Sequence, residues 1–171
     1  IIGLSVAREF NSRYPDLKIT LLEKESNLAC HASGRNSGVL HAGFYYAPDS
    51  LKSRFTAEGN RLLTDYCLRH NLSINRCGKI VVANDDKELE TLYELKKRGH
   101  INRIDLEVVD EKRLKELEPN AKTFREALHS LTTSVIDPKQ VIEHIAHNLQ
   151  GKVNIFLNEK ILERENTSTI R

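Results

Sequence analysis

The sequence predicts an α/β protein that opens with half of a dinucleotide-binding fold. A helical pattern over residues 1–14 ends at Pro15, and an apolar strand over residues 18–23 ends in Glu23. Gly3 and Glu23 have the spacing of roughly twenty residues found between the last glycine of a G-x-G-x-x-G motif and the acid that binds a ribose hydroxyl. Helices and strands then alternate along the rest of the chain, which makes α/β the expected fold class.

Length and composition define the broad class of protein. The 171 residues are enough for one ordinary domain or two small ones, and the 39% hydrophobic and 29% charged fractions are typical of globular proteins. The net charge of +2 gives no reason to expect nucleic-acid binding. Three cysteines without zinc-like spacing favour reduced thiols inside the cell. No apolar run approaches the length of a membrane span.

The beginning of the chain predicts a fragment. The sequence starts at Ile1 without an initiator methionine. The first strand and the first two glycines of a dinucleotide motif would precede Ile1, as would any targeting signal. A truncated, non-catalytic remnant is therefore an open alternative to an enzyme.

A glycine-rich loop, residues 30–46 (CHASGRNSGVLHAGFYY), is the most distinctive stretch. It contains three glycines, several short polar residues, two histidines and two adjacent tyrosines, but no carboxylate. Glycine lets a backbone approach a ligand closely, and the N–H groups of such a loop can surround an anion. The loop therefore suits a polar, electron-rich ligand better than a metal cation. A surface loop rich in turn-forming residues is the alternative.

Capping residues and apolar periodicity predict the elements that follow the loop. Ser50 is placed to begin a helix that continues to about residue 70, with charged residues mostly on a solvated face. The apolar residues with helical spacing in this helix are Leu51, Phe55, Leu62 and Tyr66. A strand is expected over residues 78–83, and Asp85 or Asp86 begins another helix that Gly99 ends. The expected buried stripe of that helix is Leu89, Leu92, Tyr93 and Leu95.

The last third of the chain continues the alternation. We expect a strand over residues 106–109, a short charged helix over residues 110–117 and one or two strands within residues 127–135. Asp137-Pro138 begins a helix with the apolar face Val141, Ile142, Ile145, Ala146 and Leu149. Further strands are expected over residues 153–157 and 160–165.

The run SGRNSGVLHAGFYYAPDSLK, preceded by LLEKE and followed by CGKIVVA, resembles the flavin-dependent amine and hydroxy-acid oxidoreductases related to D-amino-acid oxidase. Its H-x-G-x-Y-Y and P-x-S-L-K parts are most similar to the L-2-hydroxyglutarate dehydrogenase (oxidase) group. The resemblance implies an incomplete Rossmann-like FAD-binding domain with an inserted, mainly antiparallel α+β substrate domain. Residues 1–76 would begin the FAD-binding domain, residues 77–136 would begin the substrate domain, and residues 137–171 would return to the FAD-binding domain.

The resemblance also implies roles for individual residues. Gly3 would be the last glycine of the dinucleotide motif, Glu23 would bind the ribose, and Ile161 would contact the adenine through its backbone. The residues expected to bind FAD are Gly3, Glu23, Lys24, Ser33, Gly34, Asn36, Ser37, Gly38 and Ile161.

Three residues at the end of the loop are candidates for chemistry. His41 is the candidate base, because a neutral imidazole can accept a proton near pH 7. Tyr45 and Tyr46 are candidates for donating hydrogen bonds to a substrate carboxylate. The alternatives are a structural role for His41 and simple packing of a tyrosine ring under the flavin.

The implied activity is FAD-dependent oxidation of a small 2-hydroxy acid, with L-2-hydroxyglutarate converted to 2-oxoglutarate as the first expectation. FAD-dependent glycerol-3-phosphate dehydrogenase, with a similar S-x-L-I-H-G-G stretch, and other amine or hydroxy-acid oxidases of the family are the alternatives. The glycine after the histidine in that stretch is Ala42 here. Cys30, His31 and His41 match no zinc spacing, so no metal site is expected.

The implied partners are the hydroxy-acid substrate and an electron acceptor, which would be oxygen or a membrane quinone. The expected location is the cytoplasm, including the periphery of the inner membrane, or the mitochondrion in a eukaryote.

Overall fold

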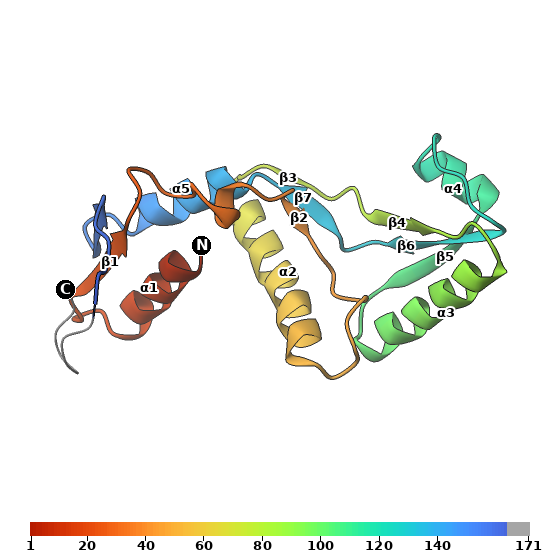
Figure 1. The fold of residues 1–171 in the computed structure, drawn as a ribbon, viewed down its shortest axis with the longest axis horizontal. Coiled ribbons are helices and arrows are strands. Elements are labelled where there is room, and N and C mark those ends of the chain that lie inside the picture. The colour runs from red at the N-terminus through yellow and green to blue at the C-terminus, as the bar shows by residue number, and fades with distance from the viewer. Residues whose placement is uncertain (164–171) are drawn as a thin grey trace. The chain divides into compact units, whose positions relative to one another are not determined.

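The computed structural model describes residues 1–163, and its contacts divide the chain into two units (Figure 1). Unit 1 combines residues 1–37 with those from 137 onward, and unit 2 comprises residues 38–136. The chain thus leaves unit 1 at Ser37, inside the glycine-rich loop, and returns to it at Asp137. The three-part division into FAD-binding and substrate domains stays a prediction.

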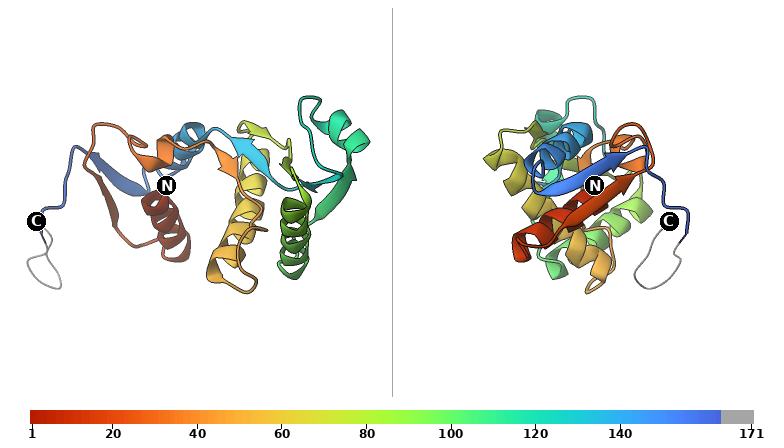
Figure 2. Two further views of the ribbon diagram at one scale, coloured as in Figure 1. Left: turned by 45° about the vertical axis from the view of Figure 1, so that its right-hand side comes forward. Right: turned by 90° about the vertical axis from the view of Figure 1, so that its left-hand side faces the viewer.

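Unit 1 is built on two parallel strands. Its elements are α1 (Ile2–Arg13), β1 (Ile19–Glu23), the 3₁₀ turn η1 (Ala32–Gly34), α5 (Pro138–Asn148) and β8 (Val153–Leu157). β1 and β8 pair in register from Ile19 opposite Val153 to Glu23 opposite Leu157, and Figure 2 shows them side by side. A parallel pair of this kind, with helices α1 and α5 in contact, agrees with the predicted half of a dinucleotide-binding fold.

Local sequence signals set the helices of unit 1. α1 ends at Arg13, two residues before Pro15, which cannot continue a helix. Asp137 caps α5, where its carboxylate accepts hydrogen bonds from the backbone N–H groups of Lys139 (2.9 Å) and Gln140 (3.2 Å). The core between these helices is formed by the buried residues Leu4, Ala7, Val141, Ile142, Ile145, Leu149 and Val153. The predictions for α1, β1, α5 and β8 are confirmed.

Unit 2 contains two three-stranded antiparallel sheets and three helices. The first sheet has the order β2-β7-β3 and the second has the order β4-β6-β5. Its elements are β2 (Val39–Leu40), α2 (Leu51–Arg69), β3 (Ile74–Asn75), β4 (Lys79–Val82), α3 (Asp86–Ile101), β5 (Leu106–Asp110), α4 (Glu111–Leu117), β6 (Glu126–Ser130) and β7 (Ser134–Ile136). These small antiparallel sheets, together with the parallel strand pair of unit 1, confirm the predicted α/β class with a mainly antiparallel segment.

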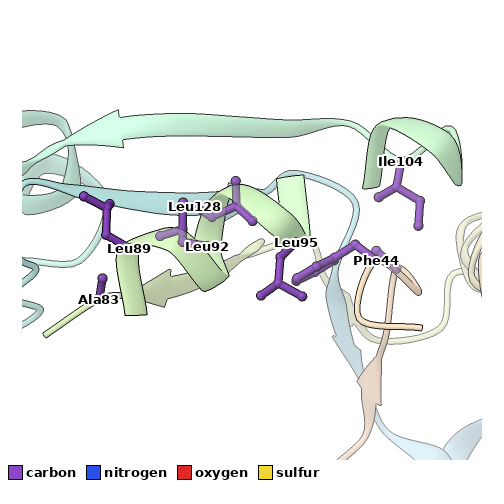
Figure 3. Close-up of a cluster of buried hydrophobic side chains, with 8 residues drawn as sticks. Phe44, Ala83, Leu89, Leu92, Leu95, Ile104 and Leu128 are labelled. Carbon is purple, nitrogen blue, oxygen red and sulfur yellow. The ribbon is translucent and has the colours of Figure 1, made fainter. Parts of the chain in front are cut away.

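The main core of unit 2 lies between α3 and the second sheet. Leu89, Leu92 and Leu95 of α3 pack toward Leu128 of β6, and Phe44 from the glycine-rich loop lies beside Leu95 (Figure 3). Burial of side chains of this size contributes roughly 1.5–3 kcal/mol each. The loop is therefore anchored by Phe44, which is 1% exposed, before it reaches the two tyrosines.

Helix α2 packs through small and polar residues rather than through its apolar ones. Ser50 caps it as predicted, but the buried residues are Ser53, Asn60 and Cys67, spaced by seven. Three of the four expected apolar side chains are exposed, with exposed fractions of 65% for Leu51, 58% for Phe55 and 50% for Leu62, and Tyr66 is half-buried. The reason is the glycine-rich loop: Gly43 approaches so closely that an added Cβ would lie 3.3 Å from the Ser53 carbonyl oxygen.

Three further expectations are wrong. Gly99 does not end α3, because the helix continues to Ile101 with Gly99 buried inside it against Leu106. Tyr93 is not part of the buried stripe, since its hydroxyl reaches outward and donates to Glu126 Oε2 at 2.5 Å. No strand forms over residues 160–163, and the remainder of that prediction, residues 164–165, lies outside the described residues.

No helix within residues 1–163 is long and apolar enough to cross a membrane.

Two helical glycines make a matched test of this packing. At Gly99 an added Cβ would lie 2.1 Å from Leu106 Cδ1 and 3.0 Å from its Cγ, whereas at Gly59 of α2 nothing lies within 4 Å. Alanine favours a helix over glycine by about 1 kcal/mol at both sites, but overpacking costs about 1–3 kcal/mol at Gly99 only. We therefore expect Gly99→Ala to be less stable than Gly59→Ala by about 1–3 kcal/mol in urea unfolding. Equal stability of the two variants would contradict the close packing of α3 on Leu106.

Candidate functional site

A cavity of about 280 Å³ lies in unit 1 where β1 ends and α1 begins. Gly3 and Leu4 line it from α1, Glu23 lines it from β1, and residues 28–33 line it from the loop. The first turn of α1 contains no acidic residue, and no side chain caps its N–H groups. A helix N-terminus at the carboxyl end of a strand is where dinucleotide-binding folds hold a phosphate and a ribose.

The Glu23 side chain is held by the backbone directly after β1. Its Oε1 accepts a hydrogen bond from the Glu25 backbone N–H at 3.0 Å. This bond fixes the carboxylate at the cavity while its second oxygen has no hydrogen-bond donor among residues 1–163. The arrangement suits the binding of ribose hydroxyls, which are donors.

The loop before Ser37 folds back on itself. Asn36 Nδ2 donates to the carbonyl oxygens of Ala32 and Ser33, each at 3.0 Å. Gly34 lies so close to Ala29 that an added Cβ would be 2.1 Å from the Ala29 carbonyl oxygen. Ser33 Oγ accepts from the Ile1 amino group at 3.3 Å. Gly34 and Asn36 therefore shape the loop. Of the predicted FAD residues Ser33, Gly34 and Asn36, Ser33 alone is in the cavity lining.

The remaining predicted FAD residues lie outside the cavity lining. Lys24 forms an ion pair with Glu25 at 3.4 Å, Ser37 is exposed, and Ile161 is exposed beyond β8. Gly38 belongs to unit 2, has a φ of 71° and accepts a hydrogen bond from the Ile136 N–H at 3.0 Å. A φ in this range favours glycine, so Gly38 is explained by the backbone itself.

His41 lies in unit 2 on a segment fixed by Asn60. The Asn60 side-chain Nδ2 donates to the carbonyl oxygens of Leu40 (2.9 Å), His41 (3.3 Å) and Thr132 (3.0 Å). Partial desolvation by the surrounding protein lowers the pKa of His41 below its ordinary value, and the positive charge of Lys79 lowers that pKa further. The imidazole is therefore neutral at pH 7 and able to accept a proton.

Tyr45 and Tyr46 lie in a turn closed by the Tyr46 N–H, which donates to the Gly43 carbonyl oxygen at 3.3 Å. The Tyr45 ring packs at a tilt against Phe44, with 4.2 Å between centroids. The Tyr46 carbonyl oxygen accepts from Asn102 Nδ2 at 3.3 Å. His41 and both tyrosines thus share one ordered loop within unit 2.

Comparison with known proteins identifies the family. The family described as DAO, FAD dependent oxidoreductase, matches residues 1–170. The chain belongs to the FAD-dependent oxidoreductase (DAO) family. This confirms the expected resemblance, with FAD as the family's cofactor.

Three curated relatives have the same name, L-2-hydroxyglutarate dehydrogenase. The chain is 44% identical to L-2-hydroxyglutarate dehydrogenase, mitochondrial, of Nematostella vectensis over 142 residues, which cover 82% of the chain and 31% of the relative. It is 46% identical to L-2-hydroxyglutarate dehydrogenase of Escherichia coli K12 over 120 residues, which cover 70% of the chain and 28% of that relative. It is 37% identical to the human mitochondrial protein of that name over 151 residues, covering 88% and 32%. The chain thus spans about a third of the length of these relatives.

Solved structures of two oxidases share the fold. L-α-glycerophosphate oxidase from Mycoplasma pneumoniae with FAD bound is 29% identical, with a TM-score of 0.84, and the match covers 95% of the chain and 43% of that structure. Glycine oxidase from Geobacillus kaustophilus is 15% identical with a TM-score of 0.83, covering 99% and 47%. At 15% identity, the match to glycine oxidase is evidence for a shared fold and not for a shared function.

Sequence reasoning missed several residues of these sites. His31 lines the unit 1 cavity and forms a 2.7 Å ion pair with Glu25, but nothing in its spacing from Glu25 signals the contact. Asn60 was detectable in principle, because it repeats at seven residues with Ser53 and Cys67 on one helix face. Lys79 could not be found from spacing, since it lies 38 residues from His41 in the sequence. Within residues 1–163, no group of three or more His, Cys, Asp or Glu side chains is placed to hold a metal ion.

The exposed cluster of Lys24, Glu25 and His31 makes an electrostatic prediction. A hydrogen bond from His31 and then one from Lys24 lower the pKa of Glu25 below its ordinary value. The stabilisation from this lowered pKa is present above the carboxyl's unfolded pKa and is lost as the pH falls through the folded one. We expect His31→Gln to raise the pKa of Glu25 and Lys24→Gln to raise it less, measured by NMR titration of the carboxyl carbon. A larger rise in Lys24→Gln would assign the main interaction to the lysine instead.

Proposed function

We propose that the protein containing this chain oxidises L-2-hydroxyglutarate to 2-oxoglutarate with FAD. The main support is that relatives named L-2-hydroxyglutarate dehydrogenase are 37–46% identical over most of the chain. The matches to the Nematostella, Dictyostelium and human relatives are 142, 154 and 151 residues long, so each must include the loop with His41, Tyr45 and Tyr46. The lowered pKa of His41 leaves the imidazole neutral and able to accept a proton at neutral pH.

The unit 1 cavity fits one end of FAD. Its volume of about 280 Å³ is near the lower limit of ligand pockets, so it suits the adenosine part of a dinucleotide rather than the whole. We infer that Glu23 binds the ribose hydroxyls, that Gly3 leaves room at the helix N-terminus for phosphate, and that Ser33 adds a hydroxyl. Lys24, Gly34, Asn36, Ser37, Gly38 and Ile161 stay predicted cofactor residues; Gly34 and Asn36 would act by holding the loop.

The protein's part in the reaction is proton transfer and orientation. FAD, when bound, accepts the two electrons that leave the substrate carbon as a hydride equivalent. In this proposal His41 accepts the hydroxyl proton, and the hydroxyl groups of Tyr45 and Tyr46 orient a substrate carboxylate. Asn60 keeps the His41 backbone in place through its three carbonyl contacts.

Glycerol 3-phosphate is an alternative substrate, because a solved structure that matches the chain at 29% identity is an L-α-glycerophosphate oxidase. Glycerol 3-phosphate is therefore a necessary comparison in every assay. The mitochondrion is the proposed location for a eukaryotic protein, because the relatives from Nematostella, Dictyostelium and human are named mitochondrial. The cytoplasm or the inner-membrane periphery, and oxygen or a quinone as electron acceptor, stay predictions.

FAD retention tests the role of Glu23. We expect Glu23→Ala to lose FAD during dialysis, because the ribose hydroxyls lose their acceptor. Glu9→Ala is the matched control, since Glu9 lies on α1 in an exposed 2.6 Å ion pair with Arg13 that contributes little to stability. Flavin absorbance after dialysis is the measurement, and equal FAD content in both variants would remove Glu23 from the cofactor site.

Flavin reduction tests the role of His41. We expect His41→Asn to lower the rate of flavin reduction by L-2-hydroxyglutarate on the order of a hundredfold or more, as for a general base, while FAD stays bound. Stopped-flow bleaching of the flavin measures this rate directly. Reduction at the parental rate would exclude His41 as the base. Bleaching of the parent by glycerol 3-phosphate but not by L-2-hydroxyglutarate would overturn the substrate and leave the flavoprotein assignment standing.

A further inference from the structure

A lysine covers each of the two tyrosines at the end of the glycine-rich loop. Lys79 Nζ lies 4.7 Å from the centroid of the Tyr45 ring, and Lys52 Nζ lies 4.4 Å from the centroid of the Tyr46 ring. Neither lysine forms an ion pair with any carboxylate among residues 1–163. Both ammonium groups are therefore held by an aromatic face and remain available to an anion.

Only one of these two lysines acts on the candidate base. The positive charge of Lys79 contributes to the lowered pKa of His41, and Lys52 does not. Lys79 thus contacts the ring of Tyr45, which follows His41 by four residues on the same loop, and its charge acts on the His41 imidazole. Lys52 has the same kind of aromatic contact without that link to His41.

Rigid elements hold Lys79 and Tyr45 in these positions. Lys79 begins β4 and pairs in register with Ser130, which is fully buried in β6. Tyr45 packs on Phe44, which is anchored in the core of unit 2. A charged group supported in this way loses little conformational freedom when a ligand binds.

The substrate's chemistry requires a cation close to the base. In a 2-hydroxy acid the hydroxyl and the C1 carboxylate are attached to adjacent carbons. The group that binds the carboxylate must therefore lie beside the group that takes the hydroxyl proton. We propose that Lys79 binds the C1 carboxylate of the 2-hydroxy-acid substrate, an inference that rests on the proposed function.

Binding at Lys79 also prepares His41 for its role. In the free protein the ammonium of Lys79 disfavours a second positive charge on the imidazole. A bound carboxylate offsets that charge, so His41 becomes more basic when the substrate is in place. The imidazolium that forms after proton transfer is then stabilised by the same carboxylate.

The test measures binding without turnover. The oxidised, FAD-loaded complete protein is titrated with 2-oxoglutarate, the product that carries the same C1 carboxylate, and the flavin absorbance is followed. We expect Lys79→Met to raise the dissociation constant about ten- to a hundredfold, as for a lost hydrogen bond to a charged group. Lys79→Arg, which keeps the charge, should restore most of the affinity. Lys52→Met is the matched control and should bind like the parent.

The pH dependence provides a second readout that a structural defect alone would not produce. In Lys79→Met the acid limb of the kcat/KM profile should move to higher pH, because His41 loses a neighbouring positive charge and its pKa rises. In Lys52→Met the limb should stay in place. If Lys79→Met does not retain FAD, Lys79→Gln replaces it in both experiments.

Several outcomes would overturn this role of Lys79. They are parental affinity for 2-oxoglutarate in Lys79→Met or Lys79→Gln, an equal loss in Lys52→Met, and a parent that does not bind 2-oxoglutarate. A parent that binds 2-oxoglutarate through Lys79 but is not reduced by L-2-hydroxyglutarate would keep the carboxylate site. That result would instead reject the proposed substrate.

Discussion

A single buried amide connects three segments of unit 2 that are far apart in the sequence. Asn60 projects from α2 and its Nδ2 reaches the carbonyl oxygens of Leu40, His41 and Thr132. These carbonyls lie at the end of β2 and in the turn between β6 and β7, where water cannot easily replace the donor because Asn60 is only 7% exposed. The position of the His41 segment therefore depends on one helical side chain. The small residues around Asn60 on the same face of α2 allow the loop to come that close.

The parts of the fold that depend on local chemistry were predictable. Ser50, Asp137 and Asp85, one of two predicted candidates, each cap a helix as expected, since capping needs only a side-chain oxygen and the N–H groups two or three residues later. The face by which α2 packs was not predictable, because the loop that lies on it selects small residues instead of the apolar ones. Likewise β2 and β3 have two residues each and exist only through their pairing with β7.

The candidate site shows the same division between local and distant signals. Gly3 and Glu23 were found because a dinucleotide motif has a fixed spacing, and both line the unit 1 cavity with Ser33. His41 and the tyrosines stood out as a run of chemically distinctive residues. Lys79 carried no such signal, since strand pairing and the turn after Gly43 bring it to Tyr45. Gly34 and Asn36 lie in the predicted loop, but their contacts are to the loop's own backbone.

Unit 2 begins and ends at one point, because the Ile136 N–H donates to the Gly38 carbonyl oxygen at 3.0 Å. A segment whose two ends meet behaves as a cassette: it can grow, shrink or be exchanged without pulling apart the residues on either side of it. The predicted cofactor residues Gly3 and Glu23 lie outside that cassette, and the candidate base His41 and Lys79 lie inside it. Insertions or exchanges within the cassette would therefore alter the surroundings of His41 and leave Gly3 on α1 and Glu23 on β1 unaffected.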